Sequence, residues 1–237
     1  MGSIGRNIAG GAAWMVLLRG LDRVIGIIST IILARLLLPA DFGVIAMAMS
    51  FVAILDLLWT FSFDAALIQN RKAERMHYDT AWTLNICFGA TIALGLLVLA
   101  HLAAWFYEDS RLVPLISCLA IGSLLQGFEN IGVVAFRREL RFGMEFALQI
   151  STKIAGFLVT IPLAFALRNY WALAAGMVAM RAAALAISYV AHPFRPRLSL
   201  AGRHELLNFS KWLFFNNLLF SVQMRTQDFV IGKVAGP

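Results

Sequence analysis

Long apolar stretches recur along the chain and are separated by short polar segments. Most of them reach about 20 residues, the length that a helix needs to cross about 30 Å of hydrocarbon. An isolated strand would leave its backbone unpaired in lipid, so all of these stretches are predicted to be helices. The predicted spans are residues 10–37, 42–66, 80–105, 112–134, 144–167, 170–191 and 212–235.

The last predicted span repeats the pattern of the first at a fixed offset. The correspondence pairs Trp14 with Trp212, Arg35 with Lys233, and Pro39 with Pro237. A true repeat would make residues 1–191 a six-helix N-terminal transmembrane lobe and residues 192–211 a cytoplasmic connector between two lobes. Residues 212–237 would then be the first helix of a truncated second lobe. Chance matching of two apolar helices is the alternative.

Composition defines the class of protein. Hydrophobic residues make up 60% of the 237 residues, charged residues only 14%, and the mean hydropathy is +0.78. Soluble domains are about half apolar and about one quarter charged, so we expect an all-α polytopic membrane protein. A nucleic-acid interface would need basic residues interleaved with aromatics on a soluble face, and the sequence has no such segment.

The positive charges of the connecting segments lie mainly on one side of the predicted membrane. That side holds Arg6, Arg71, Lys72, Arg75, Arg137, Arg138, Arg141, Arg195, Arg197, Arg203 and Lys211, and the other holds Arg35, Arg111 and Arg168. Cationic loops stay in the cytoplasm. The N-terminus is therefore predicted to be cytoplasmic, and odd-numbered spans run outward. The net charge of +7 is a topology signal.

Three charged residues interrupt the first span. Arg19, Asp22 and Arg23 are spaced to share one face of the helix, where the aspartate can pair with both arginines. The uncharged stretch that follows is too short to span alone, so part of this turn is expected at membrane depth, facing protein or a watery cavity. The alternative is that both arginines reach back to the cytoplasmic headgroups.

Other polar side chains form stripes inside the predicted spans. They are Asp56 and Asp64 in the second span, Gln126, Glu129 and Asn130 in the fourth, Glu145, Gln149 and Lys153 in the fifth, and Arg181 in the sixth. Each alone is equally compatible with a structural hydrogen bond between helices. Polar stripes on most helices of one bundle are typical of a transporter with a hydrated interior.

The sequence contains no catalytic or metal-binding constellation. Each histidine lies in a loop or near the end of a span, without a paired carboxylate or a second histidine at ligand spacing. Cys87 and Cys118 fall inside spans and are expected to be free, apolar packing residues. We therefore expect neither an enzyme nor a bound cofactor or metal.

The segment from His192 to Lys211 is the longest connection. Leu198, Leu200 and Leu206 alternate there with basic residues, as in an amphipathic piece that lies on a membrane surface. Contact with lipid headgroups is the expected role, and binding to a partner protein is the alternative.

Several stretches resemble the polysaccharide transporter family. They are LARLLLPADFG at Leu33–Gly43, FDAALIQ at Phe63–Gln69, AFRRELRF at Ala135–Phe142, YWALAAG at Tyr170–Gly176, and QDFVIGKVAG at Gln227–Gly236. This family contains Wzx-type flippases and colanic-acid-like exporters, in a superfamily shared with MATE multidrug transporters and the lipid II flippase. The resemblance covers essentially the whole chain.

The resemblance implies two six-helix lobes that move a polyprenyl-diphosphate-linked oligosaccharide across the bacterial inner membrane. Arg19 and Arg23, with Arg181 as a weaker candidate, would hold the diphosphate through charge-assisted hydrogen bonds. Asp22 would orient these arginines or couple transport to a proton gradient. Trp59, Asn85 and Gln126 would line a path for the sugars.

Two alternatives to the flippase stay open. One is a MATE-like exporter of drugs or small solutes, which arginines in the first helix disfavour for cationic cargo. The other is a scaffold without transport activity in a polysaccharide synthesis complex. Membrane lipids, the lipid-linked oligosaccharide and polysaccharide polymerase or export machinery are the expected partners. The missing second lobe predicts that the chain is a fragment or comes from an interrupted reading frame.

Overall fold

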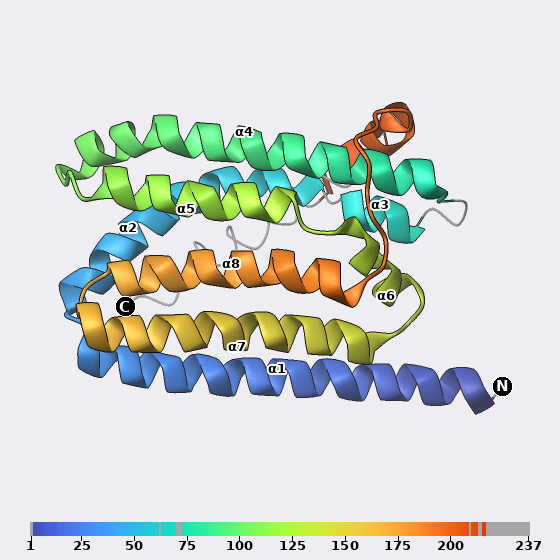
Figure 1. The fold of residues 1–237 in the computed structure, drawn as a ribbon, viewed down its shortest axis with the longest axis horizontal. Helices are drawn as coiled ribbons and strands as arrows, with labels where there is room; N and C mark the ends of the chain where they lie inside the picture. Colours follow the sequence, from blue (N-terminus) through green and yellow to red (C-terminus); the bar gives the residue numbers. More distant parts are fainter. Residues whose placement is uncertain (1, 62, 70–72, 209, 213–214, 217–237) are drawn as a thin grey trace, which may run out of the picture.

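The computed structural model describes residues 2–61, 63–69, 73–208, 210–212 and 215–216. Within these residues the regular structure is helical, without strands (Figure 1). The elements are α1 (Gly2–Leu36), α2 (Pro39–Asp56), the 3-10 turn η1 (Leu57–Phe61), α3 (Phe63–Gln69), α4 (Arg75–Tyr107), α5 (Leu112–Gly127), the 3-10 turn η2 (Ile131–Val133), α6 (Val134–Arg138), α7 (Phe142–Leu167) and α8 (Trp171–Ala191). The all-helical expectation is confirmed for this part of the chain.

Four segments of the described chain are long and apolar enough to cross a membrane. They are Pro39–Gln69, Arg75–Tyr107, Phe142–Leu167 and Trp171–Ala191. Leu112–Gly127 and Ile131–Arg138, which are bent by 62° at a short break, make a fifth if they form one span. The molecule is therefore a multi-pass membrane protein with four or five candidate spans.

The expected first span needs correction. Residues 10–37 do lie in one long helix, α1, but this helix is not among the candidate spans. The reason is physical, because Arg19, Asp22, Arg23 and Arg35 divide it into apolar pieces too short to cross the hydrocarbon alone. The expected seventh span, 212–235, and the repeat that it carries lie almost entirely outside the described residues.

Two of the predicted spans are broken where continuous helices were expected. The second changes to a 3-10 turn at Leu57, and the fourth opens at Phe128–Asn130 before turning into η2. Asp56 and Asp64 therefore do not share a helical face, since the first ends α2 and the second begins α3. Non-helical backbone at membrane depth is tolerated where protein or a cavity surrounds it.

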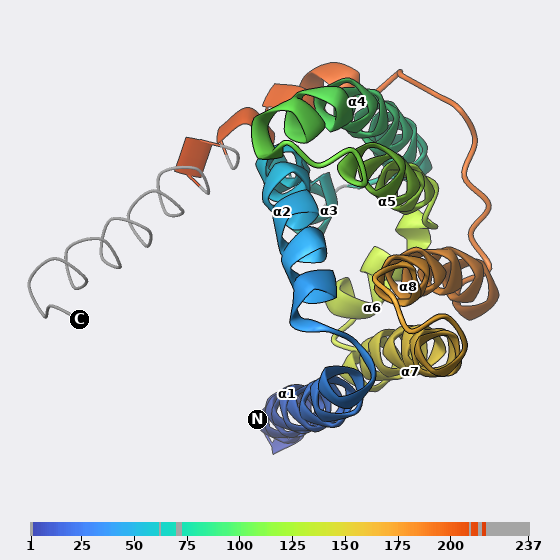
Figure 2. The same ribbon diagram turned by 90° about the vertical axis from the view of Figure 1, so that its left-hand side faces the viewer.

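The helices pack in a row that runs from α1 to α7, α8, α5 and α4, while α2 crosses to contact α4 and α5 (Figure 2). The main apolar core lies where α2, α4 and α5 meet, around Ile92, Leu96 and Leu115. The α4–α5 contact is close because two glycines face each other. A Cβ on Gly127 would lie 2.7 Å from the Asn85 carbonyl oxygen and 3.3 Å from the Gly89 Cα. In lipid there is no hydrophobic driving force to bring helices together, so their association depends on close packing. Small residues such as these glycines allow the two backbones to approach closely.

Asp41, in the stretch LARLLLPADFG, joins two turns at one end of this bundle of described helices, here called the lobe. The Leu38 amide donates to one oxygen of its carboxylate at 3.0 Å, so Asp41 closes the start of α2 after Pro39. The Tyr170 amide donates to the other oxygen at 3.1 Å. This carboxylate therefore fixes the α7–α8 turn against the α1–α2 turn.

The basic connecting segments gather at one end of the row of helices. The N-terminus of α1, the start of α4, the α6–α7 turn and the end of α8 lie together at the right of Figure 1. The α1–α2, α4–α5 and α7–α8 turns lie at the opposite end. The structure thus places the two sets of loops as the positive charges predicted, while the side of the membrane that each set faces stays a prediction.

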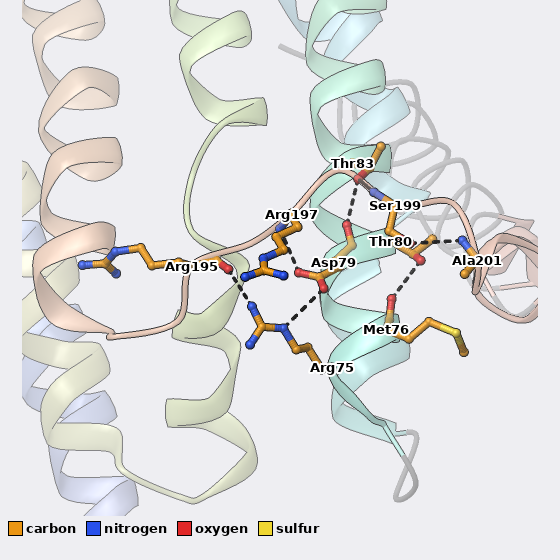
Figure 3. Close-up of polar contacts among 9 residues, drawn as sticks. All are labelled: Arg75, Met76, Asp79, Thr80, Thr83, Arg195, Arg197, Ser199 and Ala201. Carbon is orange, nitrogen blue, oxygen red and sulfur yellow. Dashed lines mark hydrogen bonds and ion pairs between the residues drawn. The ribbon is translucent and has the colours of Figure 1, made fainter.

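The connector leaves α8 and crosses to α4, where polar side chains bind its backbone (Figure 3). The Arg197 amide donates to Asp79 at 2.9 Å, the Ser199 amide to Thr83 at 3.0 Å, and the Gly202 amide to Thr80 at 3.1 Å. These three side chains share one stripe of α4. The connector is therefore bound as an extended peptide along that helix.

The far end of the connector is held by packing and by charge. Leu206 is buried among residues of α3 and α4, and the imidazole of His77 lies 2.9 Å from the Glu205 carboxylate. Leu198 is 74% exposed, and Leu200 is also exposed. The amphipathic expectation is compatible with this arrangement, although headgroup contact stays a prediction.

We expect Gly127→Ala to destabilise the lobe, because its new methyl group would meet α4 backbone that cannot move aside. Overpacking of this kind costs about 1–3 kcal/mol and should lower the midpoint of thermal unfolding in lipid nanodiscs. Gly43→Ala is the matched control, since a Cβ at Gly43 has nothing within 4 Å. Equal midpoints for the two variants would contradict the close contact.

Acid should loosen the start of the connector through His192. Burial lowers the pKa of this imidazole from its ordinary 6.5, and its Nδ1 accepts the Phe194 amide at 3.2 Å. As the pH falls, the unfolded chain therefore takes up the proton before the folded protein does. The contribution of the neutral His192 imidazole to stability is complete above about pH 6.5 and is lost as the pH falls through the folded pKa. The unfolding midpoint of His192→Gln should fall less between about pH 7.5 and pH 5 than that of the unmodified protein. His101→Gln, at an exposed site on α4, should leave the pH dependence unchanged.

Candidate functional site

The two helix breaks line one polar cavity of about 260 Å³. Trp59 comes from the first break and Asp64 from α3 just beyond it. Gln126 lies at the end of α5, and Glu129 lies in the second break. Asn85 reaches the cavity from α4. Residues predicted separately as cavity groups and as a sugar path thus meet at one site.

The carboxylates of the cavity are set among compensating groups. Asn85 hydrogen-bonds to the side chain of Asp64, and Arg137 attracts the same carboxylate. Glu129 is attracted by Arg181 of α8 and repelled by Asp64. Mixed charge of this kind lowers the cost of polar groups inside a bundle.

Arg137 is a cavity residue that the sequence interpretation missed. It was assigned to a cytoplasmic loop, but it lines the cavity from α6. Its Nε lies 2.5 Å from the Glu145 carboxylate of α7, which neutralises its charge. Glu145 in turn accepts a hydrogen bond from Gln149 at 3.0 Å. The sequence signal that could have identified Arg137 is its opposite charge to Glu145 on the other side of the α6–α7 turn.

Arg181 lies in a neighbouring cavity of about 190 Å³ with Asp56. Asp56 and Glu129 both interact with its guanidinium. The weaker of the predicted diphosphate ligands is thus flanked by two carboxylates. Asp56 and Asp64, expected together, belong to different cavities.

The predicted charged turn of α1 takes a different arrangement from the one expected. Arg19 and Arg23 are exposed, and the ion pair of Asp22 is with Lys153 of α7. Helical spacing gave the shared face correctly, but it could not show that a lysine of another helix competes for the carboxylate. Asp22 and Lys153 also line a cavity of about 300 Å³ between α1, α7 and α8.

Lys153 correspondingly leaves its own predicted stripe. Glu145 and Gln149 bond to each other near the start of α7, whereas Lys153 turns to α1. Asp22 and Lys153 therefore meet at the α1–α7 contact, and the exposed Arg19 and Arg23 lie within one helical turn of Asp22 on α1. This group, here called the α1 cationic cluster, carries a formal surplus of two positive charges.

Asn130 holds the second break together. Its backbone N–H donates to the Ser188 hydroxyl at 2.9 Å, and its side-chain oxygen accepts a hydrogen bond from the Gly132 backbone amide at 2.9 Å. Its side-chain nitrogen donates to the carbonyls of His192 and Phe194 at 3.3 and 2.8 Å. This buried side chain therefore joins the cavity wall to the start of the connector. Sequence reasoning placed Asn130 in a polar stripe without this role.

Gly132 is required at its position beside Asn130. A Cβ there would lie 2.4 Å from Nδ1 of His192 and 2.7 Å from Cβ of Phe194. The connector therefore passes directly over the backbone of η2. A larger residue would push it off the break.

Metal-ligand side chains do not cluster in the described part of the chain. No group of three or more His, Cys, Asp or Glu side chains there could hold a metal ion. Cys87 and Cys118 are both free.

The fold and the polar interior define a multi-pass helical membrane protein with broken spans around a cavity. A model of the family described as "polysaccharide biosynthesis protein" matches residues 32–237. The chain belongs to this family, whose members include the Wzx-type and ExoT-type transport proteins.

Three curated relatives align at low identity. The lipopolysaccharide biosynthesis protein WzxC of Escherichia coli (strain K12) is 22% identical over 99% of this chain and 48% of its own length. The succinoglycan biosynthesis transport protein ExoT of Rhizobium meliloti (strain 1021) is 21% identical over 98% of this chain and 47% of its own. An uncharacterized membrane protein in the cps region of Klebsiella pneumoniae is 23% identical over 90% and 45%. The chain spans about half the length of these relatives. No solved structure matches.

Replacing Asn130 by alanine should loosen the break and the connector together. The Gly132 amide would lose its acceptor in a buried site, which costs about 1–3 kcal/mol and should lower the unfolding midpoint. Limited trypsin digestion should also cut faster after Arg197, the arginine of this stretch that is not followed by proline. Thr91→Ala is the control, because this exposed hydroxyl bonds only within its own helix. Unchanged digestion of the Asn130 variant would contradict its anchoring role.

Proposed function

We propose that the whole protein is a flippase that moves a polyprenyl-diphosphate-linked oligosaccharide across the bacterial inner membrane. Family membership supports this proposal, as do relatives whose names specify lipopolysaccharide biosynthesis and succinoglycan transport. The observation that carries it is the α1 cationic cluster, in which two exposed guanidinium groups lie within one helical turn of Asp22, a residue that lines a cavity.

The diphosphate is proposed to bind Arg19 and Arg23. Guanidinium groups bind phosphate through paired, charge-assisted hydrogen bonds and are only weakly hydrated, so they suit a site that a lipid-linked anion enters from the membrane. Asp22 is engaged by Lys153, which leaves both arginines available for an anion. Arg181 is less suited, since two carboxylates already flank it.

Asp22 is proposed to position α1 against α7. Its pair with Lys153 joins the first helix to the rest of the lobe, next to the arginines that would meet the substrate. This arrangement favours a positioning role over the coupling of transport to a proton gradient. The N-terminus is proposed to face the cytoplasm, because the ends of the helices that carry the basic segments lie together.

The test uses the full-length gene in a strain that lacks its own flippase and makes the matching polysaccharide. The unmodified protein should restore surface polysaccharide. Arg19→Ala with Arg23→Ala should reduce export at least about 100-fold, because each hydrogen bond to a charged group is worth about 1.5–3 kcal/mol. Arg111→Ala, in the α4–α5 turn, should export normally.

Other outcomes would favour other functions. Drug resistance without any effect on polysaccharide would indicate a MATE-like exporter. Full rescue by the double arginine variant, at an equal amount of protein in the membrane, would remove the proposed diphosphate site and favour a scaffold.

A further inference from the structure

The polar cavity at the two helix breaks carries chemistry that the α1 cationic cluster does not explain. We propose that this cavity binds one uncharged, hydroxyl-rich sugar residue of the lipid-linked chain, at a site separate from that of the diphosphate. The inference rests on the proposed function, because it assumes a cargo that bears sugars.

The lining side chains match a sugar in their hydrogen bonding. A sugar hydroxyl both donates and accepts, so it pairs with carboxylates, which accept, and with amides, which do both. The cavity offers the carboxylates of Asp64 and Glu129 and the amides of Asn85 and Gln126. They come from α3, α4, α5 and the second break, so they converge on one volume from several directions.

Trp59 adds an apolar face and an unused donor. Its indole lines the cavity. Indole rings pack against the apolar faces of ligands, and a buried indole N–H usually donates a hydrogen bond to an acceptor. Within the described part of the chain, the buried Nε1 of Trp59 has no hydrogen-bond partner. Buried donors are nearly always satisfied, so this one points to an acceptor that arrives with a ligand.

The charge of the cavity opposes an anionic ligand. Arg137 is paired with Glu145, and Arg181 lies between Asp56 and Glu129. With Glu145 and Asp56 ionised, these groups leave no surplus of positive charge even when Asp64 and Glu129 are protonated. A diphosphate or a sugar carboxylate would therefore meet unfavourable electrostatics here, whereas a neutral sugar would not.

Size and position complete the assignment. About 260 Å³ lies just below the usual range of about 300–1,000 Å³ for small-molecule sites, which suits one sugar residue better than a whole repeat unit. α1 and α7 lie at one side of the lobe, and α3 and α4 lie at the other (Figures 1 and 2). The diphosphate and the sugar would thus contact different helices of the same lobe.

The experiment measures binding to the purified full-length protein in lipid nanodiscs by saturation-transfer NMR. The probes are methyl glycosides of glucose, galactose and mannose, methyl glucuronide, and farnesyl diphosphate. At least one neutral glycoside should bind, and the glucuronide should bind at least about tenfold more weakly than the best neutral probe. Trp59→Ala and Gln126→Ala should each weaken neutral sugar binding about tenfold or more. Trp105→Ala, at a ring that is 78% exposed on α4, is the matched control.

A conservative variant guards against misfolding. Glu129→Gln keeps the shape of the side chain and its capacity for hydrogen bonds, so neutral sugar binding should stay within about twofold while rejection of the glucuronide weakens. Arg19→Ala with Arg23→Ala should abolish binding of farnesyl diphosphate and leave the sugar signal intact.

The outcomes separate the two proposals. Equal binding of glucuronide and neutral glycosides, or unchanged binding by both the Trp59 and the Gln126 variants, would overturn the sugar site. Absence of binding by every neutral probe to a protein that exports polysaccharide would overturn it as well. Sugar binding as expected in a protein that fails to restore export would leave the site standing and remove the flippase function.

Discussion

The hydrogen bonds of Asn130 are the constraint on which the rest of the lobe depends. A helix broken within an apolar span exposes backbone groups that lipid cannot satisfy. Asn130 meets this demand with one buried side chain that accepts from Gly132 and donates to the carbonyls of His192 and Phe194. The same bonds allow Glu129 to leave the helix and reach the cavity, and they fix the point at which the connector begins.

This arrangement divides the polar groups of the lobe into two regions with opposite electrostatics. Along the inner faces of α2, α8, α3 and α6, carboxylates and guanidiniums alternate so that each positive charge has a negative neighbour. At the α1–α7 contact, by contrast, Lys153 occupies the single carboxylate and two arginines stay exposed. A cargo with a charged end and a neutral end finds a matching surface for each.

Much of this could be predicted from residue pattern, and the failures have physical causes. Hydropathy located α7 and α8 to within two residues, and loop charge grouped the ends of the described helices as Figure 1 shows them. Periodicity also selected Asp64, Gln126 and Glu129, which the structure brings together. It could not show the breaks, because an apolar run reads the same whether its backbone is continuous or bent. Nor could it pair Asp22 with Lys153, since spacing along one helix carries no information about its neighbours.

The binding of the connector to α4 restricts the segment that follows α8. Arg197, Ser199 and Gly202 are held by their backbone, and Leu206 is buried. The restraint continues beyond Leu206, since Ser210 is also fully buried. A connection that is held at this many points couples α8 mechanically to α4, because neither helix can shift without moving the segment between them.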